Sequence, residues 1–205
     1  MTTRRRTAAV AASAAVALSA VGLTAASLTP ASAAAVAHTS PRLVASGGVT
    51  MLALDAGTAK ALTANSIKVA PASEARVVAS GIAFPIQGGV LNPATLAGSL
   101  THDGGLTFTA GGKSLTIRDF TVSTTTGRLS AYVDEVGARI NVLDLSLAKA
   151  KVVASTGKLG VSGVVATLDA TAAKALDGYF GTSLFTKGLA IGTVRVGAKV
   201  GVVYK

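Results

Sequence analysis

The sequence GLTFTAGGKSLTIRDFTVS, residues 105–123, decides the fold class. Apolar residues alternate with polar ones on both sides of Gly111–Gly112, and such a glycine pair is typical of the turn of a β-hairpin. Further along, the apolar positions slip by one, to Phe120 and Val122, which predicts a β-bulge near Arg118–Asp119. The segment therefore predicts antiparallel strands with one buried and one solvated face.

The same pattern extends over residues 98–168. Alternation returns at Leu129, Ala131 and Val133, whose polar neighbours face the other way. Turn signals containing glycine separate the apolar segments, at residues 103–105, 110–112, 126–127, 136–137, 156–157 and 162–163. We expect a mainly β fold, in which a meander closes into an antiparallel β-sandwich or a curved sheet.

A short repeat flanks this β-rich region. The sequence LDAGTAKAL at residues 54–62 recurs as LDATAAKAL at residues 168–176, with seven of nine positions identical. Each copy follows one apolar run and precedes another, so the repeated unit is predicted to be strand, short helix, strand. A carboxylate at a helix start accepts the free N–H groups of the first turn. We therefore interpret Asp55 and Asp169 as helix caps and not as catalytic acids.

The N-terminus predicts an export signal. A basic run, Arg4–Arg6, precedes an Ala-rich apolar stretch, and Ala31–Ala33 has the small-x-small pattern of a signal-peptidase site. The alternative is an N-terminal membrane anchor. We expect residues 1–33 to be a signal peptide, and the protein to be secreted and extracellular or associated with the cell wall.

The rest of the chain divides into an arm and a domain. Residues 34–48 are small and polar with one proline, which predicts a flexible arm. Residues 49–205 are expected to form a single β-rich domain, with the internal repeat at 49–69 and 164–196. No later stretch reaches the roughly 18 apolar residues of a membrane-spanning helix, so no membrane span is expected after signal cleavage.

Composition limits the chemistry. The chain has no Cys, which excludes disulfides, thiolate-bound metals and a cysteine nucleophile. After residue 33 it carries sixteen Lys and Arg against nine Asp and Glu, a net charge of +7 that favours anionic partners. The basic residues are spread singly, without an aromatic stacking platform, so nucleic acid is not expected as a partner.

Few residues are candidates for catalysis or ligand binding. His102, in the sequence LTHDGG, is expected at a hairpin tip, either as a ligand or acid–base group or as a solvent-facing turn residue. Asp134 and Glu135 are adjacent, and neighbours on a strand do not face one cleft, so a solvated turn is the better interpretation. With so few candidates we do not expect an enzyme.

Three tyrosines, at positions 132, 179 and 204, complete the candidates. A Tyr phenolate can be an axial ligand of haem iron. Tyr132 lies on the polar side of its expected strand. For Tyr179 the alternative to ligand binding is a side chain that caps the core beside the second helix.

Residues 98–108, GSLTHDGGLTF, resemble the hairpin with the pattern Gly, apolar, His-x-Gly, Leu of the HtaA-type domain. Ala166–Tyr179 resembles the family's Thr-Leu-Thr element with its Ala-rich helix. That family comprises secreted and cell-surface haem-binding proteins of high-GC Gram-positive bacteria. The resemblance covers residues 102–196 and implies a β-sandwich-like assembly with a few helices. It also implies that His102 matches the His that hydrogen-bonds the family's iron-binding Tyr, and that Tyr179 matches a later Tyr.

The chain departs from the family pattern in its N-terminal part. The family's iron-binding Tyr lies in a segment that opens with a Trp-Gly pair, whereas this chain has no Trp and no Tyr before Tyr132. The axial ligand is therefore carried over to no residue. Fold alone does not imply function, so the metal and the cofactor stay open, with haem as the cofactor that the resemblance suggests.

The function expected from the sequence is an exported, non-enzymatic binding module of the cell envelope. Its ligand would be haem or another apolar anionic small molecule, with His102, Tyr132 and Tyr179 as candidate ligand-binding residues. The alternative is a surface structural or interaction protein that binds an anionic envelope polymer or lipid. A lipid carrier is a further alternative, for which a large apolar interior would be the telling feature.

Overall fold

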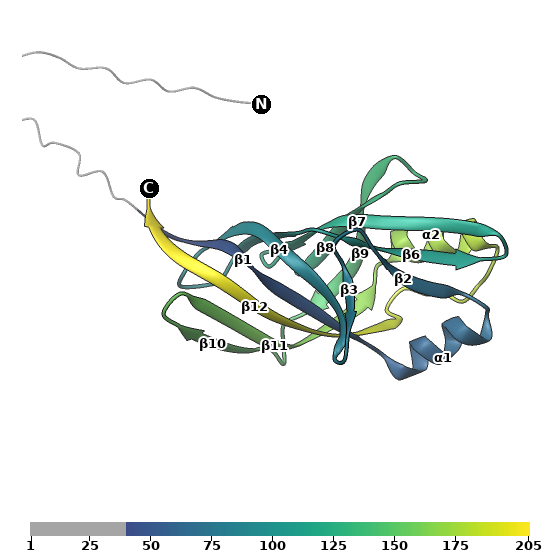
Figure 1. The fold of residues 1–205 in the computed structure, drawn as a ribbon, viewed down its shortest axis with the longest axis horizontal. Helices are drawn as coiled ribbons and strands as arrows, with labels where there is room; N and C mark the ends of the chain where they lie inside the picture. The colour runs from purple at the N-terminus through teal and green to yellow at the C-terminus, as the bar shows by residue number, and fades with distance from the viewer. Residues whose placement is uncertain (1–39) are drawn as a thin grey trace, which may run out of the picture. The chain divides into compact units, whose positions relative to one another are not determined.

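The computed structural model describes residues 40–205, which form twelve strands and two helices. In chain order these are β1 (Pro41–Leu54), α1 (Ala56–Ala64), β2 (Lys68–Ala72), β3 (Arg76–Val78), β4 (Gly81–Leu91), β5 (Gly98–His102), β6 (Gly105–Ala110), β7 (Lys113–Ser123), β8 (Arg128–Val133), β9 (Ala138–Ser146), β10 (Lys151–Ser155), β11 (Lys158–Leu168), α2 (Ala170–Phe180) and β12 (Ala190–Tyr204). Both helices lie at one end of this domain, and the C-terminus lies at the other (Figure 1).

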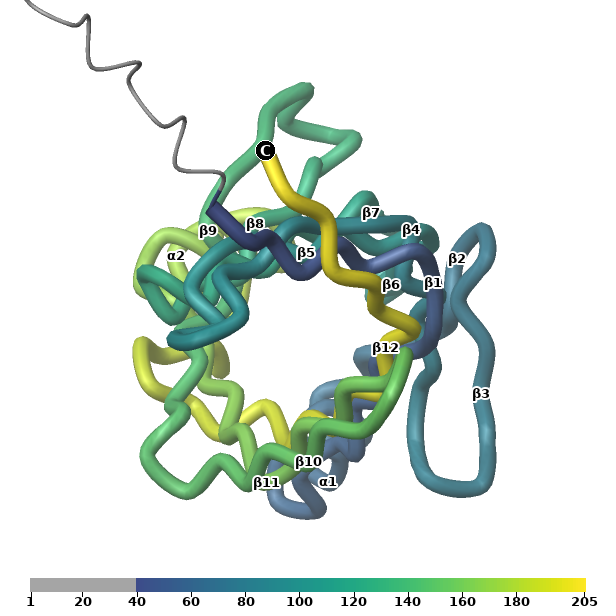
Figure 2. The backbone as a smooth tube through the Cα atoms, turned by 90° about the vertical axis from the view of Figure 1, so that its left-hand side faces the viewer, coloured from purple at the N-terminus to yellow at the C-terminus, as the bar shows by residue number. Residues whose placement is uncertain are grey.

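Eight of the strands close into an antiparallel barrel. Around the ring the order is β1, β12, β11, β9, β8, β7, β5 and β4, and β4 pairs again with β1. Figure 2 shows the backbone of these strands arranged as a ring. Four strands extend the ring, because β6 pairs with β7, β2 with β6, β3 with β4, and β10 with β11. The mainly β prediction is confirmed.

The sheet is a closed barrel, and the sequence-based expectation of a sandwich or curved sheet was wrong in this respect. Register shifts occur in β1 after Ala45, in β11 after Val161 and in β7 after Arg118. Each bulge adds local twist and bend to its strand. The accumulated curvature brings the two edges, β7 and β8, within hydrogen-bonding distance of each other. Alternation in a sequence predicts strands but does not reveal this total curvature.

The expected hairpin turn at residues 103–105 is instead a break in one long strand. β5 and β6 follow one another along the same edge of β7, with β5 beside its second half and β6 beside its first. The break faces the β7 bulge, where Asp119 has a φ of 55°. The predicted bulge near Arg118 and Asp119 is thereby confirmed. His102 lies at this break, in the barrel wall, and not at a hairpin tip.

The two helices begin as the repeat predicts. The Asp55 carboxylate accepts the N–H of Thr58 at 3.0 Å, and the Asp169 carboxylate accepts the N–H of Thr171 at 2.7 Å. α2 ends at Gly181, whose φ of 68° lies in the left-handed region. The interpretation of both aspartates as helix caps is confirmed.

Residues 41–48 form the first half of β1 and are not a flexible arm. They pair with the end of β12 on one side and with β4 on the other. The small residues serve close packing here, because at Gly48, with a φ of +119°, a Cβ would overlap the carbonyl oxygen of Gly197. The expected signal peptide and the start of the expected arm lie outside the described residues. Within residues 40–205, no helix has the length and apolar character needed to cross a membrane.

Candidate ligand cavity inside the barrel

Three neighbouring cavities lie in a row inside the barrel. An inner cavity of about 160 Å³ lies beside the helices, a middle cavity has about 50 Å³, and a third has about 440 Å³. We call the third one the mouth cavity. Leu52 and Leu143 line both the inner and the middle cavity. Thr50 and His102 line both the middle and the mouth cavity, so each cavity shares walls with the next.

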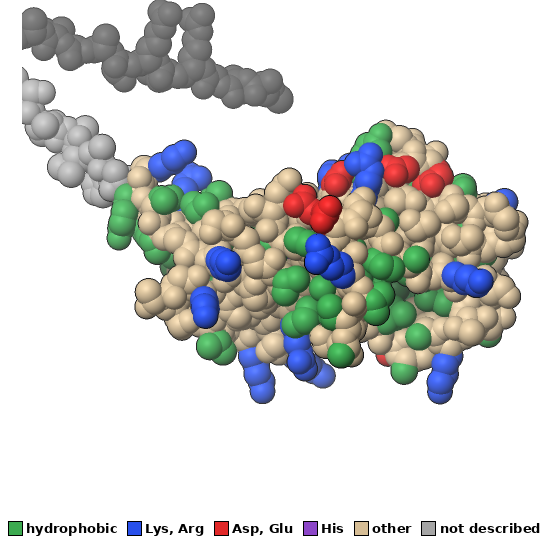
Figure 3. Space-filling model, viewed as in Figure 1, with side chains coloured by type: hydrophobic (Ala, Val, Ile, Leu, Met, Phe, Trp, Pro, Cys, Tyr) green, Lys and Arg blue, Asp and Glu red, His purple; other side chains and the backbone are tan. Residues whose placement is uncertain are grey.

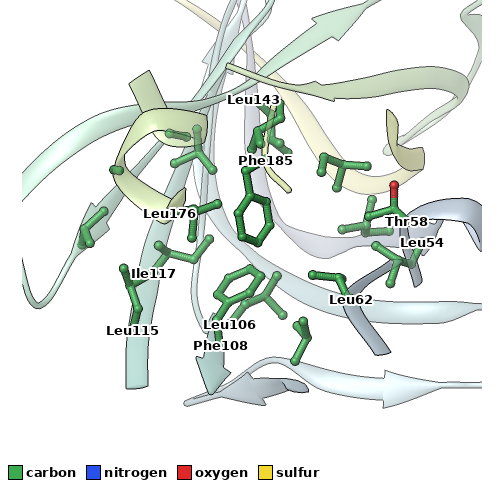
Figure 4. A pocket seen from close by; sticks show the side chains of 18 of the residues that line it. Leu54, Thr58, Leu62, Leu106, Phe108, Leu115, Ile117, Leu143, Leu176 and Phe185 are labelled. Atoms are coloured by element: carbon green, nitrogen blue, oxygen red, sulfur yellow. The ribbon is translucent and has the colours of Figure 1, made fainter. Parts of the chain in front are cut away.

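The inner cavity is apolar. Side chains from α1, α2, the strands and the α2–β12 connection converge on it, with Leu62, Leu176 and Phe185 among them (Figure 4). The one hydroxyl on its wall belongs to Thr58, and it already donates a hydrogen bond to the carbonyl oxygen of Ala190. The wall of this cavity therefore presents no unpaired side-chain polar atom to a ligand.

The mouth cavity reaches solvent at the end of the barrel that holds the C-terminus. Its wall is mainly aliphatic and comes from the β4–β5 connection, β10, β11 and β12. Leu147 and Val152 line it and are 43% and 49% exposed, which places them at its opening. Its volume is within the range of small-molecule pockets, about 300–1,000 Å³.

His102 and Thr50 form a buried polar pair in the wall between the middle and mouth cavities. They are 4% and 8% exposed. The Nε2 atom of His102 lies 2.7 Å from the Thr50 hydroxyl oxygen, and its Nδ1 atom lies 3.4 Å from the carbonyl oxygen of Phe120. β5 supplies the histidine and β1 the threonine, so the pair connects two segments that are far apart in the sequence.

The two contacts define the histidine tautomer. A carbonyl oxygen only accepts hydrogen bonds, so Nδ1 carries the proton and donates it to Phe120. The Nε2 atom of the neutral ring is then an acceptor, and the Thr50 hydroxyl donates to it. Both ring nitrogens are thus engaged within the protein.

Burial also favours the neutral ring. Loss of hydration lowers the pKa of His102 below its usual value of 6.5, and this effect outweighs the hydrogen bond to Phe120 and the nearby Asp103 carboxylate, which raise the pKa. The expectation of a solvent-facing turn residue at position 102 was therefore wrong.

The three tyrosines lie away from these cavities. Tyr132 stacks beneath Arg118 on the outer side of the wall, with 4.8 Å between the guanidinium carbon and the ring centre. The Tyr179 hydroxyl donates to the Ser114 carbonyl at 2.5 Å, which holds α2 against the β6–β7 hairpin. Tyr204 is 70% exposed at the end of β12. Of the three candidate ligand-binding residues, the structure brings only His102 to a cavity wall.

The end of the barrel around the mouth cavity is basic. The segments that build this end, residues 40–48, 88–99, 121–127, 145–163 and 196–205, contain no Asp or Glu. They carry six exposed basic residues, which we call the basic rim: Arg42, Lys149, Lys151, Lys158, Lys199 and Lys205. None of the ion pairs in the described part of the chain involves the basic rim. On the face shown in Figure 3, the acidic side chains lie away from this end.

Comparisons with known proteins identify the fold. No protein-family model and no curated protein matches the chain. The solved C-terminal domain of HtaA from Corynebacterium glutamicum matches with a TM-score of 0.58 over 78% of this chain and 99% of that chain, at 16% identity. The chain has the HtaA fold. The N-terminal HtaA domain from the same organism matches with a TM-score of 0.52 over 77% and 98% of the two chains, at 15% identity. The resemblance seen in the sequence is confirmed for the fold.

The donor groups at His102 do not fit the haem ligation that the resemblance implies. In the HtaA-type pattern a Tyr binds the iron and a His hydrogen-bonds that Tyr, whereas the hydroxyl partner of His102 is Thr50. An aliphatic hydroxyl is far less acidic than a phenol and does not supply a phenolate ligand. No Tyr lines the three cavities. Within residues 40–205, no group of three or more His, Asp or Glu is placed to hold a metal ion.

Sequence reasoning missed Thr50 as the partner of His102. A signal was present, because Thr50 shares a strand face with Leu52 in the apolar run at residues 49–54. A threonine at a core-facing position is a reason to look for a buried hydrogen-bond partner. The partner lies 52 residues away, and only the barrel reveals it.

Proposed function

We propose that this protein is an exported, non-enzymatic module that binds an apolar anionic small molecule in the mouth cavity. The observation that carries the proposal is the cavity of about 440 Å³, with aliphatic walls and the buried Thr50–His102 pair. Apolar surface that is withdrawn from water contributes about 25 cal/mol per Å² to binding. The basic rim at the opening attracts a negative charge on the ligand.

Haem is the ligand that the HtaA resemblance suggests, and it is both apolar and anionic. Since the cavities lack a phenolate donor, this chain would hold such a molecule by burial and charge and not by a tyrosinate bond. Hemin is therefore a suitable first probe for the cavity, and a fluorescent apolar dye with one negative charge is the second.

The test is a titration of the purified protein with hemin and with the dye, at low and high salt. Saturable binding with one molecule per chain, retained in high salt, is the expected result because burial in the cavity does not depend on ionic screening. Val196→Phe should weaken it at least tenfold, since Val196 points into the mouth cavity. Arg195→Phe, the exposed neighbour on the same strand, is the matched control. If neither hemin nor the dye binds saturably, the proposal is overturned.

A second candidate function is binding of an anionic envelope polymer or lipid surface through the basic rim. The observation that favours it is the presence of six exposed basic residues with no acidic residue at that end. Binding of this kind weakens steeply with salt and would not respond to Val196→Phe. The same titration, extended to a teichoic-type polymer, separates the two functions.

A further inference from the structure

We infer that the ligand is a single-chain amphiphile with an anionic head group, whose alkyl chain runs inward through the row of cavities. This inference rests on the proposed function and names its ligand class. The ligand is expected to be elongated, because the three cavities lie in a row along the inside of the barrel.

The first reason is the arrangement of the cavities. The mouth, middle and inner cavities follow one another and share walls at Thr50, His102, Leu52 and Leu143. A broad, rigid disc can occupy only the mouth, because the middle space is about 50 Å³. A flexible alkyl chain is narrow, and it passes this point once the side chains of Leu52 and Leu143 change rotamer.

The second reason is the polarity of the path. The inner cavity has only the Thr58 hydroxyl, which is already bonded to Ala190. Midway, the Thr50–His102 pair satisfies its own hydrogen bonds. No buried side-chain polar atom in the described chain lacks a partner. The path therefore requires no polar group from the ligand, and methylene groups are what it accommodates best.

The third reason is the position of the charge. Lys149 and Lys151 alternate along the chain with Ala150 and Val152, two residues that line the mouth cavity. The other four members of the basic rim lie on the same end of the barrel, which has no acidic residue. An anionic head group would remain at this opening, solvated and attracted by the rim, while its chain is buried.

The test measures displacement of the anionic dye from the purified protein by straight-chain fatty acids of 8 to 16 carbons. Affinity should rise by up to about fourfold for each added CH₂, the gain expected for about 0.8 kcal/mol per buried CH₂, until the inner cavity is filled. Tetradecanol, which has the same chain as tetradecanoate without the charge, should bind more weakly at low salt. The difference in affinity between tetradecanoate and tetradecanol should decrease as salt is added, because salt screens the attraction of the basic rim for the carboxylate.

Two pairs of variants locate the chain and the head group. Ala175→Phe fills the inner cavity and should reduce binding of the 16-carbon acid at least tenfold while leaving the 8-carbon acid unchanged. Ala170→Phe, at an exposed position of the same helix, is its control. Lys149→Glu with Lys151→Glu should weaken fatty acids but not tetradecanol, and Lys60→Glu with Lys174→Glu, exposed on the two helices, is the charge-matched control.

The outcomes distinguish this inference from the proposed function. If hemin or the dye binds but no fatty acid displaces it, or if affinity does not depend on chain length, the inference is overturned and the proposed function stands. If no probe binds, both fail. A rise in affinity with chain length in the unaltered protein supports the inference even where a variant is too unstable to purify.

Discussion

The side chains of Thr50 and His102 satisfy their hydrogen bonds within the protein, one with the other and with the carbonyl of Phe120. The pair is buried, Thr50 donates to Nε2, and Nδ1 donates to a backbone carbonyl. Removal of one partner of such a pair leaves a buried polar atom without a partner, at a cost of about 1–3 kcal/mol. Substitutions at Thr50 or His102 are therefore expected to change both the stability of the protein and the polar groups that line the cavities.

A Thr50→Tyr substitution should give the barrel a hemin ligand. The phenol would lie on the strand position whose hydroxyl now contacts His102, beside the mouth cavity. We expect hemin to bind the variant at least tenfold more tightly than the parent protein, with a shifted Soret band, because a tyrosine oxygen can ligate haem iron. Thr50→Phe has the same ring without the oxygen and should show neither change. Equal spectra for the Tyr and Phe variants would contradict the prediction.

The stability of the protein should fall below neutral pH because of His102. Unfolding restores the pKa of this residue to about 6.5, whereas burial holds it lower in the folded state. In the interval between the two pKa values the unfolded chain binds more protons, so the free energy of unfolding decreases as the pH falls through 6.5. Above about pH 8 the ring is neutral in both states and its effect on the free energy of unfolding vanishes.

Urea unfolding at intervals between pH 8 and 5 measures this dependence. His102→Gln, which cannot titrate, is the comparison, because Gln can still donate to one neighbour and accept from the other. His38 is present in both proteins, so any contribution from it cancels. An identical slope in the two proteins below pH 6.5 would show that His102 is not the source.

At the scale of elements, the strands and the helix caps could be predicted from the sequence. The connection between β5 and β6 and the closure of the sheet could not. The 105–123 alternation predicted β6 and β7 and a bulge near Arg118–Asp119, because side-chain alternation indicates directly which residues share a strand face. The register shift in the structure lies between Arg118 and Thr121. The Gly104–Gly105 pair was misread as a hairpin turn. A glycine pair signals unusual backbone geometry, and a break in a continuous strand needs it as much as a turn does.

The caps at the two helices should each contribute measurably to stability. Asp55 and Asp169 accept N–H groups in the first turns of α1 and α2. Replacement of either by Ala should reduce the free energy of unfolding by about 1 kcal/mol, and replacement by Asn by less, because Asn still caps. Denaturant unfolding of the four single variants tests this. Equal losses for Ala and Asn would mean that the hydrogen bond is not the source of the effect.

At the scale of the whole molecule, closure of the barrel creates the cavities and separates its two ends. Side chains of both helices line the inner cavity, and the basic rim lies at the end of the barrel that holds the mouth cavity. The candidate site could be predicted only in part for this reason. His102 was found from its local motif, whereas Thr50, the cavities and the charge-segregated end depend on segments that are distant in the sequence and meet only when the sheet closes.

The first and last strands of the described chain, β1 and β12, pair with each other in the ring. Their pairing runs from Pro41 opposite Tyr204 to Leu54 opposite Gly192. Gly48 allows the close approach, since it has a φ of +119° and a Cβ there would overlap the Gly197 carbonyl. Gly48→Ala must therefore adopt a strained backbone and push the two strands apart, and we expect it to lower the free energy of unfolding by at least about 2 kcal/mol.

Gly201→Ala provides the matched control, because Gly201 lies on the same strand pair, needs no left-handed backbone, and has room for a Cβ, with no other atom within 4 Å of the position it would take. It should change the free energy of unfolding by no more than about 0.5 kcal/mol. Urea unfolding followed by circular dichroism measures both.

If Gly48→Ala opens the ring, it also exposes two strand edges, so this variant should aggregate. It should also lose dye binding, since the cavities exist only inside a closed barrel. Equal stability of the two variants would show that close packing at Gly48 is not needed for closure.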